Sequence, residues 1–294
     1  MVTQGPYQDL LQQEARHWGN VKPDPKNPQI WDDQVLQEIC FGEQHRHLID
    51  RVATNGPVIL ELGCGEGNLA LDFARKKLRV TAIDLSSERI KRARSKAAKT
   101  KLKVRFQVGD LNTMRLPRNR YDCVVANGSL HHILDLDHIL DEASKSLKQN
   151  GSLIVFDFIG MGAFRKIVAA ILYALLPTYK PYAAKWQLRS RVKSFLASEQ
   201  SRRAGLKGNN SSVLHPESPF EEISQESIIP AIKRHFRIKE LNTILPFWYY
   251  LAAKIRLSNR LKYRVARSFR AMDDFLVQTK ISRGAYVFIE ASKN

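Results

Sequence analysis

Three glycines at alternate positions are the residues of this sequence that point most directly to a binding function. They are Gly63, Gly65 and Gly67, and Glu61 stands two residues before the first of them. Glycine has no Cβ atom, so it adopts positive φ values and lets a ligand lie directly against the backbone. A helix that begins after such a turn also presents backbone amides to a polar group. These residues predict a binding turn for a flat or extended ligand.

The elements on either side of this turn are a strand and a helix. Residues 58–62 form a short apolar run typical of a buried strand, and residues 69–74 carry apolar side chains at helical spacing. Dinucleotide-binding turns have the same arrangement, but they require glycines at the first, third and sixth positions. Counting from Gly63, the sixth position is Asn68, so the dinucleotide pattern is not satisfied.

Further carboxylates follow the next two predicted strands. Asp84 lies at the end of the apolar stretch 78–85, and Asp110 follows the stretch 104–108. The carboxyl ends of neighbouring parallel strands meet at one edge of a sheet, where an acidic side chain can accept hydrogen bonds from ribose hydroxyls. Each of these carboxylates could alternatively be a surface, capping or turn residue. A fourth strand, 121–126, is followed by Asn127.

The order of these residues resembles motifs I to IV of the class I S-adenosylmethionine-dependent methyltransferases, over residues 50–160. The resemblance implies that Glu61 and the glycines surround the amino-acid end of the cofactor. It also implies that Asp84 binds the ribose, whereas Asp110 and the Leu111 amide bind the adenine. The implied cofactor-binding residues are Glu61, Gly63, Cys64, Gly65, Gly67, Asp84, Leu85, Asp110, Leu111, Asn127 and Ser129.

The residues after the fourth strand indicate the class of acceptor. Family members that methylate exocyclic amino groups of nucleic acids carry Asn or Asp followed by Pro-Pro and an aromatic residue, whereas this chain has Asn-Gly-Ser-Leu at 127–130. The run Ser-Leu-His-His is more similar to members that act on small molecules and lipids. A base near the acceptor helps methylation of a hydroxyl or an activated carbon. We expect His131 to be that base and His132, the weaker catalytic candidate, to lie in the core.

Alternating strands and helices predict an α/β fold with a parallel sheet covered on both faces. The resemblance implies a Rossmann-like doubly wound sheet of seven strands, mostly parallel with an antiparallel last strand, and helical lid insertions. The expected division is N-terminal cap helices at 1–52, a cofactor-binding core at 53–160, a helical lid insertion at 161–222, and completion of the sheet at 223–294 with a second helical insertion at about 247–280.

Several local patterns give more detailed expectations. Asn150-Gly151 is a plausible C-cap for a helix at 136–147. After residue 160 we expect an apolar helix at 164–176, a basic helix at 183–203, and a helix at 224–234. A strand at 235–243, a long basic and aromatic helical stretch at 247–277 and a last strand at 284–291 follow.

The net charge of +18 is concentrated in the second half of the chain. Residues 151–294 hold 24 Lys and Arg against 10 Asp and Glu, whereas residues 1–150 hold 23 against 19. A basic half attracts nucleic acid, a membrane surface or a phosphorylated substrate, although a solvated surface gives the same count. The two insertions combine apolar and basic residues, which suits an anionic amphiphile or an acidic membrane surface. Their apolar residues could also simply pack the lid onto the core.

Cysteine usage and hydropathy bear on localisation. Cys40, Cys64 and Cys123 are a sparse, odd set that predicts reduced thiols, without a disulfide framework or a metal site. The N-terminal residues lack a basic start followed by an apolar run, and the most apolar stretches are shorter than the ~20 residues that span a bilayer. We therefore expect a cytoplasmic protein that can contact a membrane peripherally.

These observations predict an enzyme that transfers a methyl group from S-adenosyl-L-methionine to a small, lipid-like or anionic acceptor, by O- or C-methylation rather than N-methylation. Two alternatives stay open. One is an RNA methyltransferase that uses the basic C-terminal half, and the other is a catalytically inactive cofactor-binding module.

Overall fold

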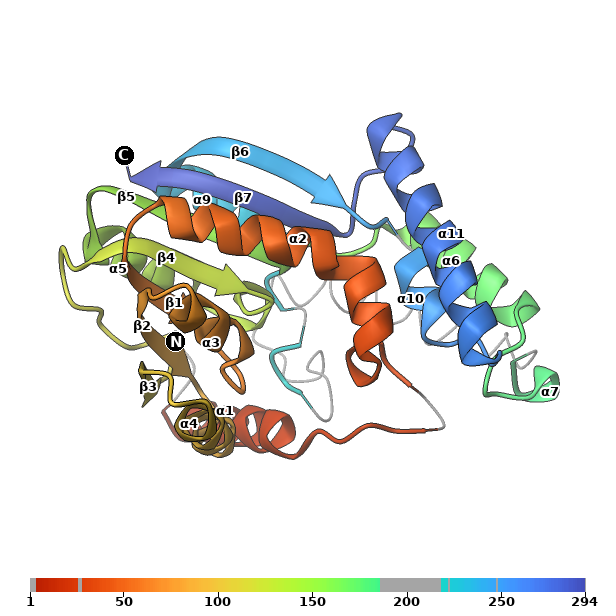
Figure 1. Ribbon diagram of the computed structural model, residues 1–294, viewed down its shortest axis with the longest axis horizontal. Helices are drawn as coiled ribbons and strands as arrows, with labels where there is room; N and C mark the ends of the chain where they lie inside the picture. Colours follow the sequence, from red (N-terminus) through yellow and green to blue (C-terminus); the bar gives the residue numbers. More distant parts are fainter. Residues whose placement is uncertain (1–3, 26–27, 186–217, 222, 247, 294) are drawn as a thin grey trace.

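A computed structural model of the chain describes all residues except 1–3, 26–27, 186–217, 222, 247 and 294. Its centre is one seven-stranded sheet in the order β3-β2-β1-β4-β5-β7-β6 (Figure 1). The first five strands are parallel, and β7 runs antiparallel between β5 and β6. This topology confirms the predicted fold class. The strands are β1 (Val58–Leu62), β2 (Arg79–Asp84), β3 (Val104–Val108), β4 (Tyr121–Asn127), β5 (Leu147–Phe158), β6 (Phe236–Ile244) and β7 (Tyr286–Lys293).

Helices cover both faces of this sheet. The α-helices in the described residues are α1 (Gln4–Asn20), α2 (Gln34–Thr54), α3 (Asn68–Arg75), α4 (Ser87–Thr100), α5 (Leu136–Ser146), α6 (Ala163–Leu175), α7 (Tyr182–Lys185), α9 (Ile228–His235), α10 (Trp248–Ala252) and α11 (Asn259–Gln278). Two short 3₁₀ helices are η1 (Ile30–Asp32) and η2 (Leu130–His132). Among the described residues, no helix combines the length and the apolar character that crossing a membrane requires.

Two hydrophobic cores lie on opposite faces of the sheet because successive strand residues point in opposite directions. On β1, Ile59 packs with apolar residues of α2, α3 and α4. Leu60 and Leu62 pack instead with apolar residues of α5 and α9. Glu61 alternates with Leu60 and Leu62 and therefore points toward the same face as Ile59. A carboxylate is thus placed at the edge of an apolar core, directly before the glycine turn.

The predicted helix cap at Asn150-Gly151 is wrong. Helix α5 ends at Ser146, and β5 already begins at Leu147, which pairs with Tyr121 of β4. The pairing of β4 and β5 then shifts, and it resumes at Cys123 with Ser152. The Asn-Gly pair therefore lies within the irregular start of a strand, because pairing with β4 prevails over the local turn preference.

The long helical stretch expected at 247–277 is divided into two helices, α10 and α11. Between them, Ile255 pairs with Thr178 in an isolated bridge, and the amide of Arg256 donates to the carbonyl of Pro177. These contacts place the segment before α11 next to the segment after α6. The helix expected at 224–234 begins later than predicted, at Ile228. Of the helix expected at 183–203, all but the start lies outside the described residues.

Helices α6 and α11 both lie beyond the end of the sheet (Figure 1). The side chain of Arg165, near the start of α6, donates to the carbonyl of Arg283 after α11. The chain after α6 meets the chain before α11 through the Thr178–Ile255 bridge. The two helices therefore run antiparallel to each other. Helix α11 also packs against α2 and α10, which attaches this part of the protein to the sheet.

Asp273 of α11 fixes the start of α10. It is fully buried, and its two carboxylate oxygens accept hydrogen bonds from the amides of Trp248 and Tyr249, both at 3.1 Å. We predict that Asp273→Ala lowers the free energy of unfolding by about 2–3 kcal/mol, because buried amides lose their acceptor. Urea denaturation followed by circular dichroism measures this loss.

The neighbouring Asp274 provides a matched control, because it pairs with Arg270 at the partly exposed side of α11. Asp274→Ala should cost less than about 1 kcal/mol. Equal losses for the two variants would show that burial of Asp273 is not what stabilises this junction.

Candidate active site

The glycine turn connects β1 to α3 and is left-handed at all three glycines. The φ angles of Gly63, Gly65 and Gly67 are 71°, 54° and 75°. A Cβ atom on Gly63 would lie 2.3 Å from Cβ of Ser129, and one on Gly67 would lie 2.7 Å from the ring of Phe106. At Gly65 the nearest atom would be 3.5 Å away. The two ends of the turn are therefore packed against neighbouring elements, while its middle has space against the backbone.

Asp84 at the end of β2 holds the middle of this turn. Its Oδ2 accepts a hydrogen bond of 2.7 Å from the amide of Gly65, and its Oδ1 accepts one of 2.9 Å from the amide of Ser86. The side chain is nearly buried, at 7% exposed. Each carboxylate oxygen has two lone pairs, so both can accept a further hydrogen bond. The predicted ribose-binding carboxylate thus lies beside the glycine turn.

Asp110 lies next to Asp84 because β2 and β3 are paired and the amide of Gly109 donates to the Asp84 carbonyl, at 3.0 Å. Oδ1 of Asp110 accepts from the amide and the side chain of Asn112. Oδ2 accepts from the Tyr7 hydroxyl at 2.6 Å. The second predicted carboxylate therefore reaches the same edge of the sheet, where a residue of helix α1 contacts it.

Glu61 is the least satisfied of the three carboxylates. It is 2% exposed, and its Oε2 has no hydrogen-bond partner in the described part of the chain. Burial, followed by the nearby charges of Asp84 and Asp72, raises the pKa of Glu61 to about 8. Near neutral pH the side chain is therefore mostly protonated. A buried carboxyl with an unpaired oxygen at a bare glycine turn fits a ligand that brings a positively charged group.

His131 is held by Asp157, a residue that the sequence analysis did not select. Nδ1 of His131 lies 2.5 Å from Oδ1 of the fully buried Asp157. Oδ2 of Asp157 accepts from the amides of Ser129 and Leu130, at 3.0 and 2.7 Å. One carboxylate therefore fixes both the loop after β4 and the imidazole ring. With Nδ1 at a carboxylate, Nε2 is the ring atom that can take up a proton.

Helix α1 lies along the glycine-turn side of the sheet and contacts η2 and α4. The Trp18 ring meets His132 edge-on at 5.2 Å, and the Arg89 guanidinium lies 4.8 Å from the same indole. Oε1 of Glu14 is 3.3 Å from Nδ1 of His132. Burial opposes ionisation of Glu14, but contacts with His132 and the Phe220 amide outweigh it and lower the pKa of Glu14. His132 is thus half-buried beneath α1, whereas His131 is the more buried of the two histidines.

The other predicted site residues lie around the same edge. Cys64 is buried, and burial, then the carboxylates of Glu61 and Asp84, raises the pKa of its thiol. Its amide donates to the carbonyl of Ile83 at 2.9 Å, which ties the turn to β2. Ser129 donates its hydroxyl to the Leu62 carbonyl at 2.8 Å. Leu85 and Asn127 are half-buried and Leu111 is buried. The structure therefore brings the predicted residues together at the carboxyl edge of β1, β2, β3 and β4.

Four residues of the site were missed from the sequence: Tyr7, Glu14, Trp18 and Asp157. Asp157 had a visible signal, because it is a lone carboxylate in an otherwise apolar strand, and buried charges need partners. The three residues of α1 had none, because their contacts join segments about one hundred or more positions apart in the chain, such as Tyr7 with Asp110. Their helix could be predicted from spacing, but the surface that it covers could not.

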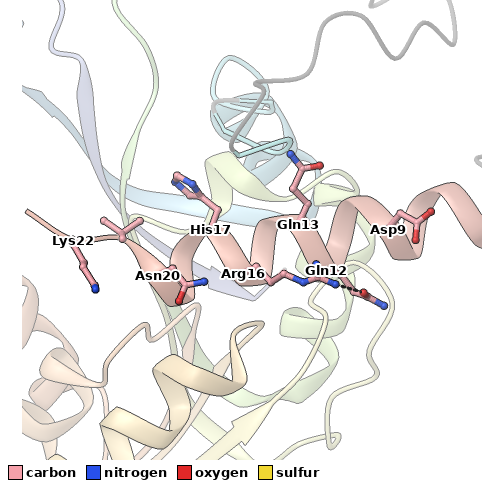
Figure 2. Close-up of a pocket in the computed structure, with 8 residues that line it drawn as sticks. Asp9, Gln12, Gln13, Arg16, His17, Asn20 and Lys22 are labelled. Atoms are coloured by element: carbon pink, nitrogen blue, oxygen red, sulfur yellow. Dashed lines mark hydrogen bonds between the residues drawn. The ribbon is translucent and has the colours of Figure 1, made fainter. Parts of the chain in front are cut away.

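Two other features lie close by. A hollow of about 770 Å³ lies along α1 and the residues after it (Figure 2), and it is lined by Asp9, Gln12, Gln13, Arg16, His17, Asn20, Val21 and Lys22. The glycine turn contributes none of these residues. Potential metal ligands in the described residues gather at His131, His132 and Glu221, with ligand atoms within 4.8 Å of one another. Both histidines are already paired with carboxylates. The expected absence of a metal stays a prediction.

Comparison with known proteins identifies the domain around this edge. Residues 59–151 match the family described as "Methyltransferase domain". The chain contains a class I methyltransferase domain, and S-adenosylmethionine is the cofactor of that family. The matched region runs from β1 to the start of β5, so it includes all three carboxylates and the two histidines.

Curated relatives of this methyltransferase domain are similar over part of their length. The 27-O-demethylrifamycin SV methyltransferase of Amycolatopsis mediterranei is 31% identical over 44% of this chain and 49% of its own. The ubiquinone biosynthesis O-methyltransferase of Pelagibacter ubique is 27% identical over 44% of this chain and 50% of its own. The chain thus spans about half the length of the curated relatives it matches.

Solved structures share the fold over nearly the whole chain. The geranyl diphosphate C-methyltransferase of Streptomyces coelicolor, in complex with Mg²⁺, geranyl diphosphate and S-adenosyl-L-homocysteine, aligns over 99% of this chain and 100% of its own. Its TM-score is 0.59 at 15% identity. The [4+2]-cyclase SpnF aligns over 84% of this chain and 80% of its own, with a TM-score of 0.50 and 19% identity. At these identities the likeness shows the fold alone.

The raised pKa of Glu61 leads to a prediction about cofactor binding. S-adenosylmethionine carries a positive ammonium and a positive sulfonium, which favour the ionised carboxylate. We predict that binding near pH 7 releases up to about one proton, and that affinity rises with pH up to the Glu61 pKa of about 8. Calorimetry in two buffers of different ionisation enthalpy measures the number of protons released.

Glu61→Gln is the matched variant, because it keeps the shape of the side chain and removes its titration. This variant should bind the cofactor without releasing that proton. Equal proton release from the variant and the natural protein would assign the titration to another group.

Proposed function

We propose that this protein transfers the methyl group of S-adenosylmethionine to a small acceptor, at oxygen or at an activated carbon. The observation that carries the proposal is the cluster formed by the bare glycine turn, Asp84 and Asp110, with the unpaired oxygen of Glu61 beside it. In this arrangement Glu61 and the turn hold the amino-acid end of the cofactor. Asp84 accepts from the ribose hydroxyls, and Asp110 with Leu111 holds the adenine.

When bound, the cofactor would supply an electrophilic methyl group that passes to the acceptor, and S-adenosylhomocysteine would be the leaving group. The chain then has to orient the acceptor, keep water away and take up a proton. His131 is suited to the last role, because Asp157 fixes its ring and stabilises the imidazolium that forms. His132, paired with Glu14 beneath α1, holds η2 in place.

An aromatic cluster beside His131 supports an apolar acceptor. The Phe158 ring lies 6.2 Å from the His131 ring and 5.3 Å from the Tyr286 ring. Tyr286 in turn meets Phe41 and Tyr249, at 5.2 and 5.5 Å. These rings form a continuous aromatic cluster next to the proposed base, against which a lipid-like acceptor would pack. The relatives named above are called rifamycin, ubiquinone-pathway and geranyl diphosphate methyltransferases, which agrees with O- or C-methylation of small molecules.

The expected cap and lid are part of this proposal. Helix α1 would cap the cofactor, supported by its contacts at Asp110 and His132. The end of the 161–222 insertion and the residues after it would form a lid that packs against α1 and η2. Ser218 donates its hydroxyl to Glu14. Ser224 donates its hydroxyl to the carbonyl of Leu130, at 2.8 Å.

A catalytically inactive cofactor-binding module is the second candidate. SpnF shares the fold and is named as a cyclase, so the fold by itself does not imply methyl transfer. One experiment separates the candidates. The protein is incubated with methyl-labelled cofactor and cell extract, and the label is fractionated into RNA, protein, lipid and small molecules. We expect label in the lipid or small-molecule fraction. Label in RNA supports the nucleic-acid alternative, and saturable cofactor binding without any label supports the inactive module.

Asp84→Ala tests the proposed cofactor site directly. The variant loses the acceptor for the ribose hydroxyls and for the Gly65 amide, so cofactor affinity should fall by about 100-fold, at ~1.5 kcal/mol for each hydrogen bond to the carboxylate. Titration calorimetry measures this change. Asp137→Ala, which removes an exposed carboxylate paired with Arg234, should leave affinity unchanged. Unaltered binding by Asp84→Ala would remove the basis for the site.

His131→Gln tests the proposed base. We predict that methyl transfer to the labelled extract fraction falls about 10²- to 10⁴-fold, while cofactor affinity stays within a few-fold of the natural protein. His138→Gln is the matched control, because His138 lies in the first turn of α5 and is bonded to the Met114 carbonyl. Undiminished methyl transfer by His131→Gln would show that the reaction needs no base at this position and that positioning of the acceptor and the cofactor is sufficient.

A further inference from the structure

We infer that the protein docks on anionic membranes through a surface formed by residues 161–185 and 248–283, here called the basic extension. It contains α6, α7, α10 and α11 and stands beyond the end of the sheet (Figure 1). This inference does not depend on methyl transfer, since it concerns a surface away from the glycine turn.

The charge of the basic extension is strongly one-sided. Its two segments hold 13 Lys and Arg against two Asp, a net charge of +11 in 61 residues. Both aspartates are engaged, Asp273 at the start of α10 and Asp274 with Arg270. Nearly all of the charge excess of the second half of the chain is therefore located here.

The basic residues divide into an inner and an outer set. On the inner side of α11, Lys262 pairs with Asp33, and Arg270 pairs with Asp274. Arg256 before α11, and Arg260, Arg264 and Arg267 on its outer side, are exposed, and none of them forms a salt bridge within the described residues. These positive charges are therefore not compensated by any described acidic residue.

Exposed apolar side chains gather on the same part of the molecule. Among the described residues, 17 large hydrophobic side chains are exposed, and ten of these belong to the basic extension, which is about a fifth of the chain. These ten are Ile167, Ile171, Leu175, Tyr179, Tyr182, Tyr250, Leu261, Met272, Phe275 and Ile281. Such concentration marks an interaction site, whereas scattered single residues do not.

On α6 the exposed residues form a regular stripe. Ile167, Ile171 and Leu175 are spaced four residues apart, so they share one side of the helix. They are 50%, 50% and 62% exposed, so this side of α6 faces solvent. On α11, Leu261, Met272 and Phe275 lie on one stripe beside the outer arginines. The alternative that the apolar residues of the insertions simply pack the lid onto the core therefore does not hold for Ile167, Ile171 and Leu175.

A bilayer with anionic lipids fits this combination better than other partners. Aliphatic side chains enter the boundary between headgroups and acyl chains, while neighbouring arginines contact lipid phosphates. A nucleic acid would satisfy the arginines but would leave the isoleucine stripe exposed to water. A second copy of the chain would bring two surfaces of +11 together, which electrostatic repulsion opposes.

The test is sedimentation of the full chain with vesicles, without cofactor or acceptor. We expect binding to phosphatidylcholine vesicles that contain phosphatidylglycerol, weakened by salt, and little binding to pure phosphatidylcholine. Equal binding to both, or to neither, would overturn the inference. A salt-sensitive complex with RNA, without vesicle binding, would also overturn it. The same holds for a dimer that Ile171→Glu dissociates, if the protein does not bind vesicles.

Two pairs of variants resolve the apolar and the charged contributions. Ile171→Glu should weaken vesicle binding at least tenfold, whereas Leu241→Glu, at an exposed leucine of β6, should have little effect.

Replacing both Arg264 and Arg267 with Gln should weaken vesicle binding about 25-fold, at roughly fivefold for each charge near an anionic surface. The same double change at Lys91 and Lys99 of α4, at the opposite end of the molecule, should alter it less than twofold. Similar losses in a variant and its control would refute docking by the basic extension, and unchanged thermal unfolding excludes misfolding as the cause.

Discussion

The hydrogen bond between the Asp84 carboxylate and the Gly65 amide is the contact around which the site is organised. It joins the end of β2 to a turn whose glycines have positive φ angles, and it is reinforced by the bond from the Cys64 amide to Ile83. Because β1 and β2 are parallel neighbours, the strand register sets the distance between carboxylate and turn. The positive φ angles of the glycine turn and the register of β1 with β2 are thus both needed to form the proposed cofactor site.

Site residues that stand at the end of a recognisable strand could be predicted from the sequence. The glycine pattern, Asp84 and Asp110 each follow a strand whose apolar run is visible, so the parallel sheet places them at one edge. Contacts between distant segments could not be predicted in the same way. Neither the role of Tyr7 nor the interruption between α10 and α11 follows from local spacing, because each depends on what another part of the chain presents.

Asp157 could be predicted from the sequence only in part. A carboxylate inside β5 breaks the apolar pattern and signals a buried partner, although not which one. In the structure that partner is the loop after β4, including His131. The residue that orders the loop is therefore carried by the strand next to it, and pairing of Asn127 with Phe156 keeps the two in register. A scaffold strand, rather than a mobile loop, determines the geometry of the proposed base.

The Tyr7 hydroxyl occupies one oxygen of Asp110 at 2.6 Å. Burial, then Asp110 itself, raises the pKa of Tyr7, so the phenol is a hydrogen-bond donor at neutral pH. Any nucleoside that recruits this carboxylate must therefore displace the phenol or share the carboxylate with it. Because Tyr7 belongs to α1, this helix and such a nucleoside would meet at the same carboxylate.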